Sequence, residues 1–246
     1  MEWHLVPAAA CAAIGAASGL VVPRIIGSVP EPEPDPGEKA GDYPDKVPYA
    51  DLAARRRLLP GSVVTAGLAG AALGAVLGWS WALPWLLFLL PIGIALAVID
   101  YVTWFLPTRI IRPSYAVVGV LVLVASAARP DWRYAAAAAL GLALIGGYYG
   151  LMYLISPRIM ARGDVRLGGL LGLALGPFGV MTLLLSVLLA ALSMLVALPV
   201  MRLLGNTVKR EEGVLGSLGK RHVPFGPFLL VGALLAVLLG QVLVVS

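Results

Sequence analysis

The chain has 246 residues, of which 60% are hydrophobic and 13% are charged, and its formal net charge is +5. Soluble domains typically have roughly 25% charged and 45–50% apolar residues. One soluble core of this length could not bury so many apolar side chains, so the composition excludes an ordinary soluble protein and predicts a protein embedded in lipid.

Apolar windows long enough to cross a bilayer follow one another along the chain. A membrane-spanning helix needs about 20 mostly apolar residues, and such windows lie at residues 5–23, 62–80, 83–100, 114–129, 134–155, 165–181, 182–203 and 225–245. The sixth and seventh share one apolar run that is interrupted at Gly176 and Pro177, which we interpret as a helical hairpin. The sequence therefore predicts an all-α polytopic membrane protein with about eight transmembrane helices in a single domain, residues 1–246.

The only sizeable polar stretch, residues 27–60, separates the first two windows. It opens with alternating proline and acidic residues from Pro30 to Pro36, a pattern that cannot form a helix interior or a core strand. Residues 49–59 have the composition of a short helix on the membrane surface, with three consecutive arginines, Arg55 to Arg57, facing anionic headgroups. We expect the whole stretch to be a flexible cytoplasmic loop.

Basic residues are distributed unevenly between the predicted loops. If the N-terminus is outside, all but two of the 18 Lys and Arg residues fall in the inner loops, and only Arg129 and Arg133 fall outside. Cytoplasmic loops of membrane proteins carry such an excess of basic residues. We therefore expect both termini outside, with the lipid bilayer as a partner. The basic residues of the inner loops account for the positive net charge, so the charge gives no reason to expect nucleic-acid binding.

Glycine recurs at every fourth residue in two of the predicted spans. The two sets are Gly70, Gly74 and Gly78, and Gly168, Gly172 and Gly176. Small residues at this spacing let helix backbones approach each other closely in lipid. The pattern predicts a tightly packed bundle and carries no chemistry of its own.

Residues that could hold a metal ion are scarce. Cys11 is the only cysteine, which excludes an internal disulfide, a CxxC zinc site and an iron–sulfur cluster. The only histidines, His4 and His222, exclude a histidine-rich site. We expect no metal and no cofactor, and we expect Cys11 to be a buried thiol without a chemical role.

Two aspartates stand apart from the other acidic residues. Most of the 13 acids lie in the polar stretch, in loops or near the N-terminus, whereas Asp100 ends the third apolar window and Asp164 opens the sixth. Because two spans separate them, both carboxylates are predicted at the cytoplasmic rim, at similar depth. An acidic residue at the rim of a span is costly to keep there, which makes it a functional candidate.

Two carboxylates in one partly desolvated site suit the activation of water. They do not both ionise easily at close range, so they titrate as a coupled pair that shares a proton. One can take a proton from water, while the other polarises a substrate carbonyl and protonates the leaving amine. Gly163, directly before Asp164, leaves room for a substrate backbone or a neighbouring helix to come close.

The same residues allow other interpretations. Either aspartate could be a solvated helix cap, and a helix N-terminus is a favourable place for Asp164. A proton-coupled transporter or an assembly scaffold could also carry such residues. Serine and zinc intramembrane proteases are disfavoured, because neither His4 nor His222 lies within a span and no HExxH motif is present.

Four motifs occur along the chain in a specific order. They are Ser18-Gly19-Leu20-Val21-Val22-Pro23-Arg24, Ile99-Asp100 followed by Leu106-Pro107, Gly163-Asp164-Val165-Arg166-Leu167, and Val223-Pro224-Phe225-Gly226-Pro227-Phe228. Together they resemble the motifs of the prepilin peptidases (type IV leader peptidases), which are intramembrane aspartyl proteases of the GxGD type. The resemblance covers most of the chain.

The resemblance implies an aspartic endopeptidase of the bacterial plasma membrane that acts on prepilin-like precursors. Cleavage would occur on the cytoplasmic side, between a short basic leader and a hydrophobic helix and typically just after a glycine, with Asp100 and Asp164 as the catalytic pair. The stretch Pro224 to Phe228 would support the structure and could place backbone near that pair.

The chain also departs from the family pattern. Residues 27–60 replace the zinc-bearing segment with paired CxxC motifs, so the N-methyltransferase activity of many members is doubtful here. Ala161 stands where the GxGD motif has its first glycine.

Overall fold

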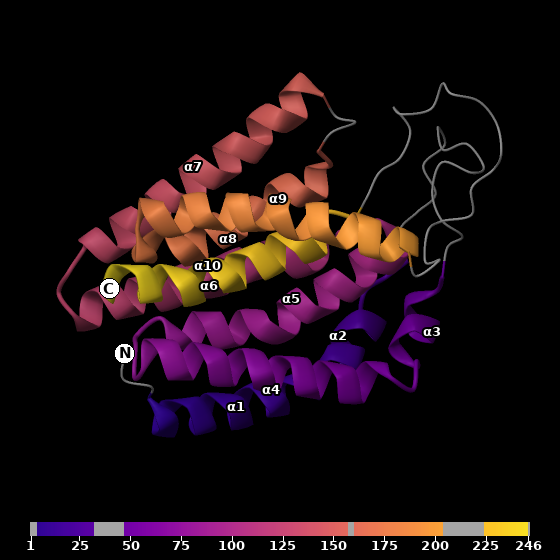
Figure 1. Ribbon diagram of the computed structural model, residues 1–246, viewed down its shortest axis with the longest axis horizontal. Coiled ribbons are helices and arrows are strands. Elements are labelled where there is room, and N and C mark those ends of the chain that lie inside the picture. Colours follow the sequence, from indigo (N-terminus) through magenta and orange to yellow (C-terminus); the bar gives the residue numbers. More distant parts are fainter. Residues whose placement is uncertain (1–3, 32–46, 157–159, 204–223, 246) are drawn as a thin grey trace.

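A computed structural model describes residues 4–31, 47–156, 160–203 and 224–245. Within these ranges every regular element is a helix and no strand occurs, which confirms the all-α prediction. Most of the long helices lie roughly side by side in one bundle, as Figure 1 shows.

The first half of the chain supplies five helices. The predicted first span is divided into α1 (Leu5–Gly19) and α2 (Val22–Gly27) by a turn, α3 (Tyr49–Ala53) is short, and α4 (Leu58–Leu77) and α5 (Leu83–Thr103) are long. Within residues 27–60, the structure therefore places α3 and the start of α4, while residues 32–46 lie outside the described residues. The predicted surface helix at 49–59 corresponds to α3 but ends earlier, at Ala53.

The second half supplies α6 (Thr108–Ala128), α7 (Arg133–Ile155), α8 (Arg162–Leu175), α9 (Val180–Leu203) and α10 (Gly226–Val245). Between α8 and α9, the single 3-10 turn η1 (Gly176–Phe178) is followed by Gly179 at φ +92°, a conformation that glycine adopts readily. The turn confirms that the apolar run is interrupted at Gly176 and Pro177. Cys11 is buried in α1, as expected.

Among the residues that the structure describes, six helical segments are long and apolar enough to cross a membrane. They are Leu5–Gly27, Leu58–Leu77, Leu83–Thr103, Thr108–Ala128, Arg133–Ile155 and Val180–Ala197. Of the other two predicted spans, one corresponds to α8, which has 14 residues and includes Arg162, Asp164 and Arg166, and the other to α10, whose apolar part is Gly226–Gln241. The composition of the six segments supports a multi-pass membrane protein.

The ends of the helices define two ends of the bundle. At one of them, called here the aspartate end, α5 ends and α8 and α10 begin; α1 starts and α10 finishes at the opposite end (Figure 1). Exposed arginines collect near the aspartate end, on α2 (Arg24), before α4 (Arg55 to Arg57), on α6 (Arg109, Arg112) and on α8 (Arg162). Exposed tryptophans lie in the connections at the opposite end, namely Trp79, Trp81 and Trp132.

Glycines bring helix backbones into direct contact at two interfaces, as their spacing predicted. On α4, Gly70 faces the carbonyl of Cys11 and Gly74 faces that of Pro7, so α1 lies against α4. On the other side of the bundle, Gly172 faces the carbonyl of Gly141 in α7. A Cβ atom at any of these positions would collide with backbone. Gly78 has a different role, because it ends α4 at φ +59°.

Two glycines on α7 offer a matched test of this packing. Gly141 lies against the backbone of α8, whereas a Cβ atom at Gly147 would meet nothing within 4 Å. Both replacements by alanine raise helix propensity by about 1 kcal/mol, but overpacking typically costs about 1–3 kcal/mol. We expect Gly141→Ala to lower the free energy of unfolding in detergent and Gly147→Ala to leave it unchanged or slightly higher. Equal effects of the two substitutions would contradict the close α7–α8 contact.

Candidate functional site

Asp100 lies one turn before the end of α5 and is removed from solvent. Only 4% of its surface is exposed. The backbone N–H of Gly226, the first residue of α10, donates a hydrogen bond of 2.9 Å to Oδ2 of Asp100. A Cβ atom at Gly226 would lie 2.8 Å from the same oxygen, so only glycine lets the start of α10 come this close. The sequence prediction that the stretch Pro224 to Phe228 places backbone near the aspartates is confirmed for Asp100.

Asp164 lies in the first turn of α8 and is also buried, with 7% of its surface exposed. Its Oδ2 accepts a long hydrogen bond of 3.3 Å from the backbone N–H of Ala161, the residue that precedes the helix. The cap contact that was considered from the sequence is therefore present, but the carboxylate is not solvated. A cap function alone does not explain the burial, because exposed caps satisfy the same N–H groups at lower desolvation cost.

The segment after α5 connects the surroundings of the two aspartates. Trp104 adopts the left-handed conformation at φ 55° and donates its N–H to the carbonyl of Asp100, which ends the helix. Leu106 then turns inward, where its Cβ lies 2.7 Å from the ideal Cβ position of Gly163 and its Cδ2 lies 3.3 Å from that of Gly226. Each aspartate thus has a neighbouring glycine in contact with the same leucine.

Aromatic rings pack beside Asp164. Tyr149 of α7 is buried, lies against Gly168 of α8, and meets the ring of Phe225 edge-on with 6.2 Å between centroids. Phe225 directly precedes Gly226, so this contact ties α7 and α8 to the start of α10. The absence of a side chain at Gly168 is what leaves space for Tyr149.

A polar connection between α6 and α8 fixes the helix that carries Asp164. The guanidinium of Arg166, two residues after Asp164, donates to Oγ1 of Thr108 at 2.6 Å. The hydroxyl of Tyr115, also on α6, donates to the carbonyl of Arg166 at 2.6 Å and occupies the space beside Gly169. Since α6 follows Leu106 after a single proline, these bonds hold α8 against the segment that joins it to Asp100.

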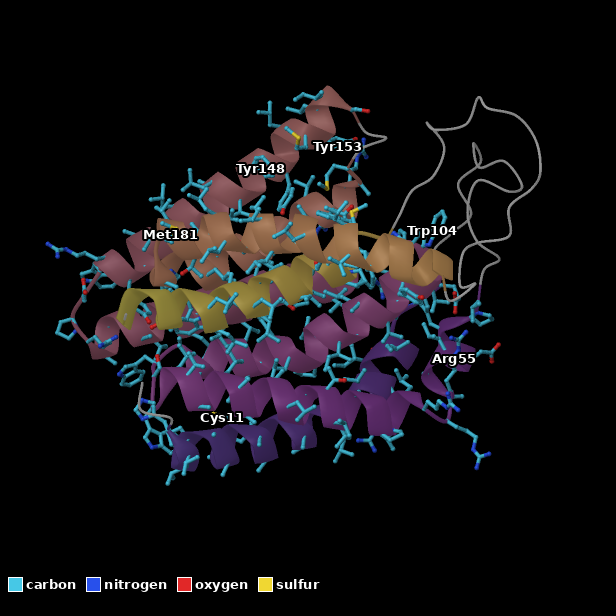
Figure 2. The ribbon with its side chains drawn as sticks, viewed as in Figure 1. Cys11, Arg55, Trp104, Tyr148, Tyr153 and Met181 are labelled. Atoms are coloured by element: carbon cyan, nitrogen blue, oxygen red, sulfur yellow. The ribbon has the colours of Figure 1, made fainter. Side chains whose placement is uncertain are left out.

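Figure 2 draws the side chains over the whole bundle. Trp104, Tyr153 and Arg55 lie at the aspartate end, whereas Met181 lies at the opposite end. Tyr153 of α7 accepts a hydrogen bond of 2.6 Å from Nε of Arg162, two residues before Asp164. The sequence predicted Asp100 and Asp164 at the same end of the bundle, because two spans separate them. The structure agrees, since α5 ends and α8 begins at the aspartate end.

The remaining predicted residues are distributed as follows. Gly163 is half-buried and faces Leu106, so a neighbouring segment does come close to it. His222 and Val223 lie outside the described residues. Among the described acids, only Asp100 and Asp164 are buried; Glu31, Asp51 and Asp131 are exposed. No group of three or more His, Cys, Asp or Glu residues that could hold a metal ion occurs in the part of the chain that the structure describes.

Comparison of the chain with protein-family models, curated proteins and solved structures finds no match. The functional argument therefore depends on the site itself and on the motifs in the sequence.

The contact between Arg166 and Thr108 can be measured by a double-mutant cycle. Hydrogen bonds to charged groups typically contribute about 1.5–3 kcal/mol, and residues in contact show coupling of about 0.5–3 kcal/mol. We expect Arg166→Met and Thr108→Val to be coupled by about 1 kcal/mol in the free energy of unfolding in detergent. Arg24→Met, which removes an exposed arginine from α2, serves as the control and should add to Thr108→Val without coupling. Additive effects of the first pair would show that the bond does not hold α6 to α8.

Proposed function

We propose that this protein is an intramembrane aspartyl endopeptidase that removes the basic leader of prepilin-like precursors by activating water between Asp100 and Asp164. The observation that carries the proposal is the burial of these two carboxylates, on different helices at one end of an apolar bundle, each beside a glycine that contacts Leu106. The four ordered motifs that resemble those of the prepilin peptidases support the substrate class.

The chemistry needs no group beyond the two carboxyl groups and a water molecule. The ionised carboxylate takes a proton from water, and the water oxygen bonds to the carbonyl carbon of the scissile peptide. The protonated carboxyl donates a hydrogen bond to the carbonyl oxygen that becomes negatively charged. When the C–N bond breaks, this carboxyl passes its proton to the amine nitrogen, and the proton taken from water stays on the other carboxyl, so that the pair again holds one proton. The products are a new carboxyl terminus on the leader and a new amino terminus on the hydrophobic helix.

The position of the pair suits a substrate cut near the membrane surface. Asp100 is three residues from the end of α5, and Asp164 lies in the first turn of α8. Exposed arginines surround this end, and exposed tryptophans, which favour membrane interfaces, lie at the other. We infer that the aspartate end is cytoplasmic, that α8 and α10 complete eight crossings of a bacterial plasma membrane, and that the hydrophobic helix of the precursor stays in the bilayer during cleavage.

Substitution of each aspartate tests the proposal. Asparagine keeps the size of the side chain but cannot act as acid or base, and general acid–base catalysis typically contributes about 10²–10⁴-fold to a rate. We expect Asp100→Asn and Asp164→Asn each to slow cleavage of a prepilin-like precursor by at least about 100-fold. Product formation by the purified protein in liposomes is followed by mass spectrometry.

Asp51→Asn is the matched control, because Asp51 is an exposed aspartate on α3, and it should cleave at the wild-type rate. All variants are compared at equal membrane abundance. Wild-type rates in either Asp100→Asn or Asp164→Asn would exclude the pair as the catalytic groups. A wild-type protein that binds or transports without producing a peptide product would favour the transporter or scaffold alternative.

The pH dependence of cleavage provides a second test of the mechanism. One carboxyl must be ionised and the other protonated, so the active form exists only between the two titration steps of the pair. We expect a bell-shaped profile of kcat/KM: at low pH both groups are protonated and no base is present, and at high pH both are ionised and no acid is present. A rate that rises steadily with pH, with the protein still folded, would contradict an acid–base pair.

A further inference from the structure

Tyr149 is the largest of the four buried residues of α7, and only 3% of its surface is exposed. It lies six residues before α7 ends at Ile155, and therefore towards the aspartate end of the bundle (Figure 1). An aromatic ring buried there can contact the helices that carry or support Asp100 and Asp164, and the structure shows two such contacts.

The first contact of the ring is with α8. The ideal Cβ position of Gly168 lies closest to Cδ2 of Tyr149 and 2.9 Å from its Cε2, so the ring fills the space that a side chain at Gly168 would need. Gly168 follows Asp164 by four residues, which places the two on one face of α8, about one turn apart. The ring is thereby seated directly beside the turn that carries Asp164.

The second contact is with the start of α10. The rings of Tyr149 and Phe225 meet edge-on, with 6.2 Å between centroids and 73° between planes. The carbonyl of Phe225 accepts the N–H of Leu229, which fixes its backbone in the first turn of α10. The next N–H along the chain, that of Gly226, donates to Oδ2 of Asp100 at 2.9 Å. The ring therefore contacts the residue directly before the donor to Asp100.

We infer that Tyr149 is a positioning residue that sets the separation of the two aspartates. The inference rests on the proposed peptidase function and adds to it the ring that holds the acid and the base in place. Tyr149 acts through Gly168 on the side of Asp164 and through Phe225 on the side of Asp100. Without the ring, the start of α10 is free to shift relative to α8.

The experiment measures kcat/KM for a prepilin-like precursor as a function of pH, with purified wild type, Tyr149→Phe and Tyr149→Leu in liposomes. Phenylalanine keeps the ring and both of its contacts, so Tyr149→Phe should match the wild type. Leucine removes the contact with Phe225 and leaves space beside Gly168. Because small misplacements of reacting groups are costly, we expect Tyr149→Leu to lower kcat/KM by at least about 10-fold.

The width of the pH profile distinguishes positioning from a general loss of stability. Two carboxyl groups that move apart repel each other less, so their two titration steps come closer together. We expect the bell-shaped profile of Tyr149→Leu to be narrower than that of the wild type. Partial unfolding would lower the amount of active protein and leave the width of the profile unchanged.

Tyr148→Leu is the matched control, because Tyr148 is the adjacent tyrosine on α7 and 44% of its surface is exposed. It should keep both the rate and the width of the wild-type profile. If Tyr149→Leu does not accumulate in the membrane, Phe225→Leu replaces it, since this substitution removes the other ring of the same contact and should narrow the profile in the same way.

The outcomes separate the two proposals. A profile of wild-type width in both Tyr149→Leu and Phe225→Leu, or equal narrowing in Tyr149→Phe and Tyr149→Leu, overturns the role of the ring and leaves the peptidase proposal standing. Failure of the wild type to cleave the precursor at any pH overturns both.

Discussion

Burying a carboxylate costs free energy unless hydrogen-bond donors surround it or a nearby group shares a proton with it. This constraint applies to the aspartate end of the bundle. Asp100 and Asp164 receive backbone N–H groups from Gly226 and Ala161. Neither bond alone offsets the burial of a full charge. In the proposed peptidase, a proton shared between the two groups would reduce this cost, and the same proton would serve in acid–base catalysis on a peptide bond.

The positions of Asp100 and Asp164 depend on helices other than the two that carry them. At the aspartate end, α6 and α10 pack against both α5 and α8, through Arg166 and Thr108 on one side and Gly226 on the other. Towards the opposite end, the indole N–H of the buried Trp85 on α5 donates to the carbonyl of Ala174 on α8 at 3.1 Å. The two helices are therefore tied near both ends. Ties of this kind hold the two helices in a fixed arrangement, and the proposed acid–base chemistry requires such fixed positions.

Several features could be predicted from local patterns in the sequence. The same-end placement of Asp100 and Asp164 follows from counting spans, and the break between α8 and α9 follows from Gly176 and Pro177. The close backbone contacts of α4 and α8 follow from their glycine spacing, which does not say that α1 and α7 are the partners. Contacts between distant side chains carry no such pattern. Nothing in the sequence pairs Arg166 with Thr108 or places Tyr149 on Gly168. Two adjacent glycines, Gly168 and Gly169, did indicate that bulky side chains could lie against α8 at this point, and the structure places Tyr149 and Tyr115 there. The predicted sixth span, residues 165–181, extends beyond the end of α8. The reason is that the apolar sequence continues through η1, whereas the helix ends at Leu175.

An infrared titration of the carboxyl bands of the folded protein, without any substrate, tests most directly whether Asp100 and Asp164 share one site. Wild type, Asp100→Asn and Asp164→Asn are compared, so that each band is assigned by its loss. Two carboxyl groups at one buried site repel when both are ionised, so removal of either should shift the titration midpoint of the other and replace two separate steps by one. If each aspartate titrates at the same pH whether or not the other is present, the two groups do not form a pair.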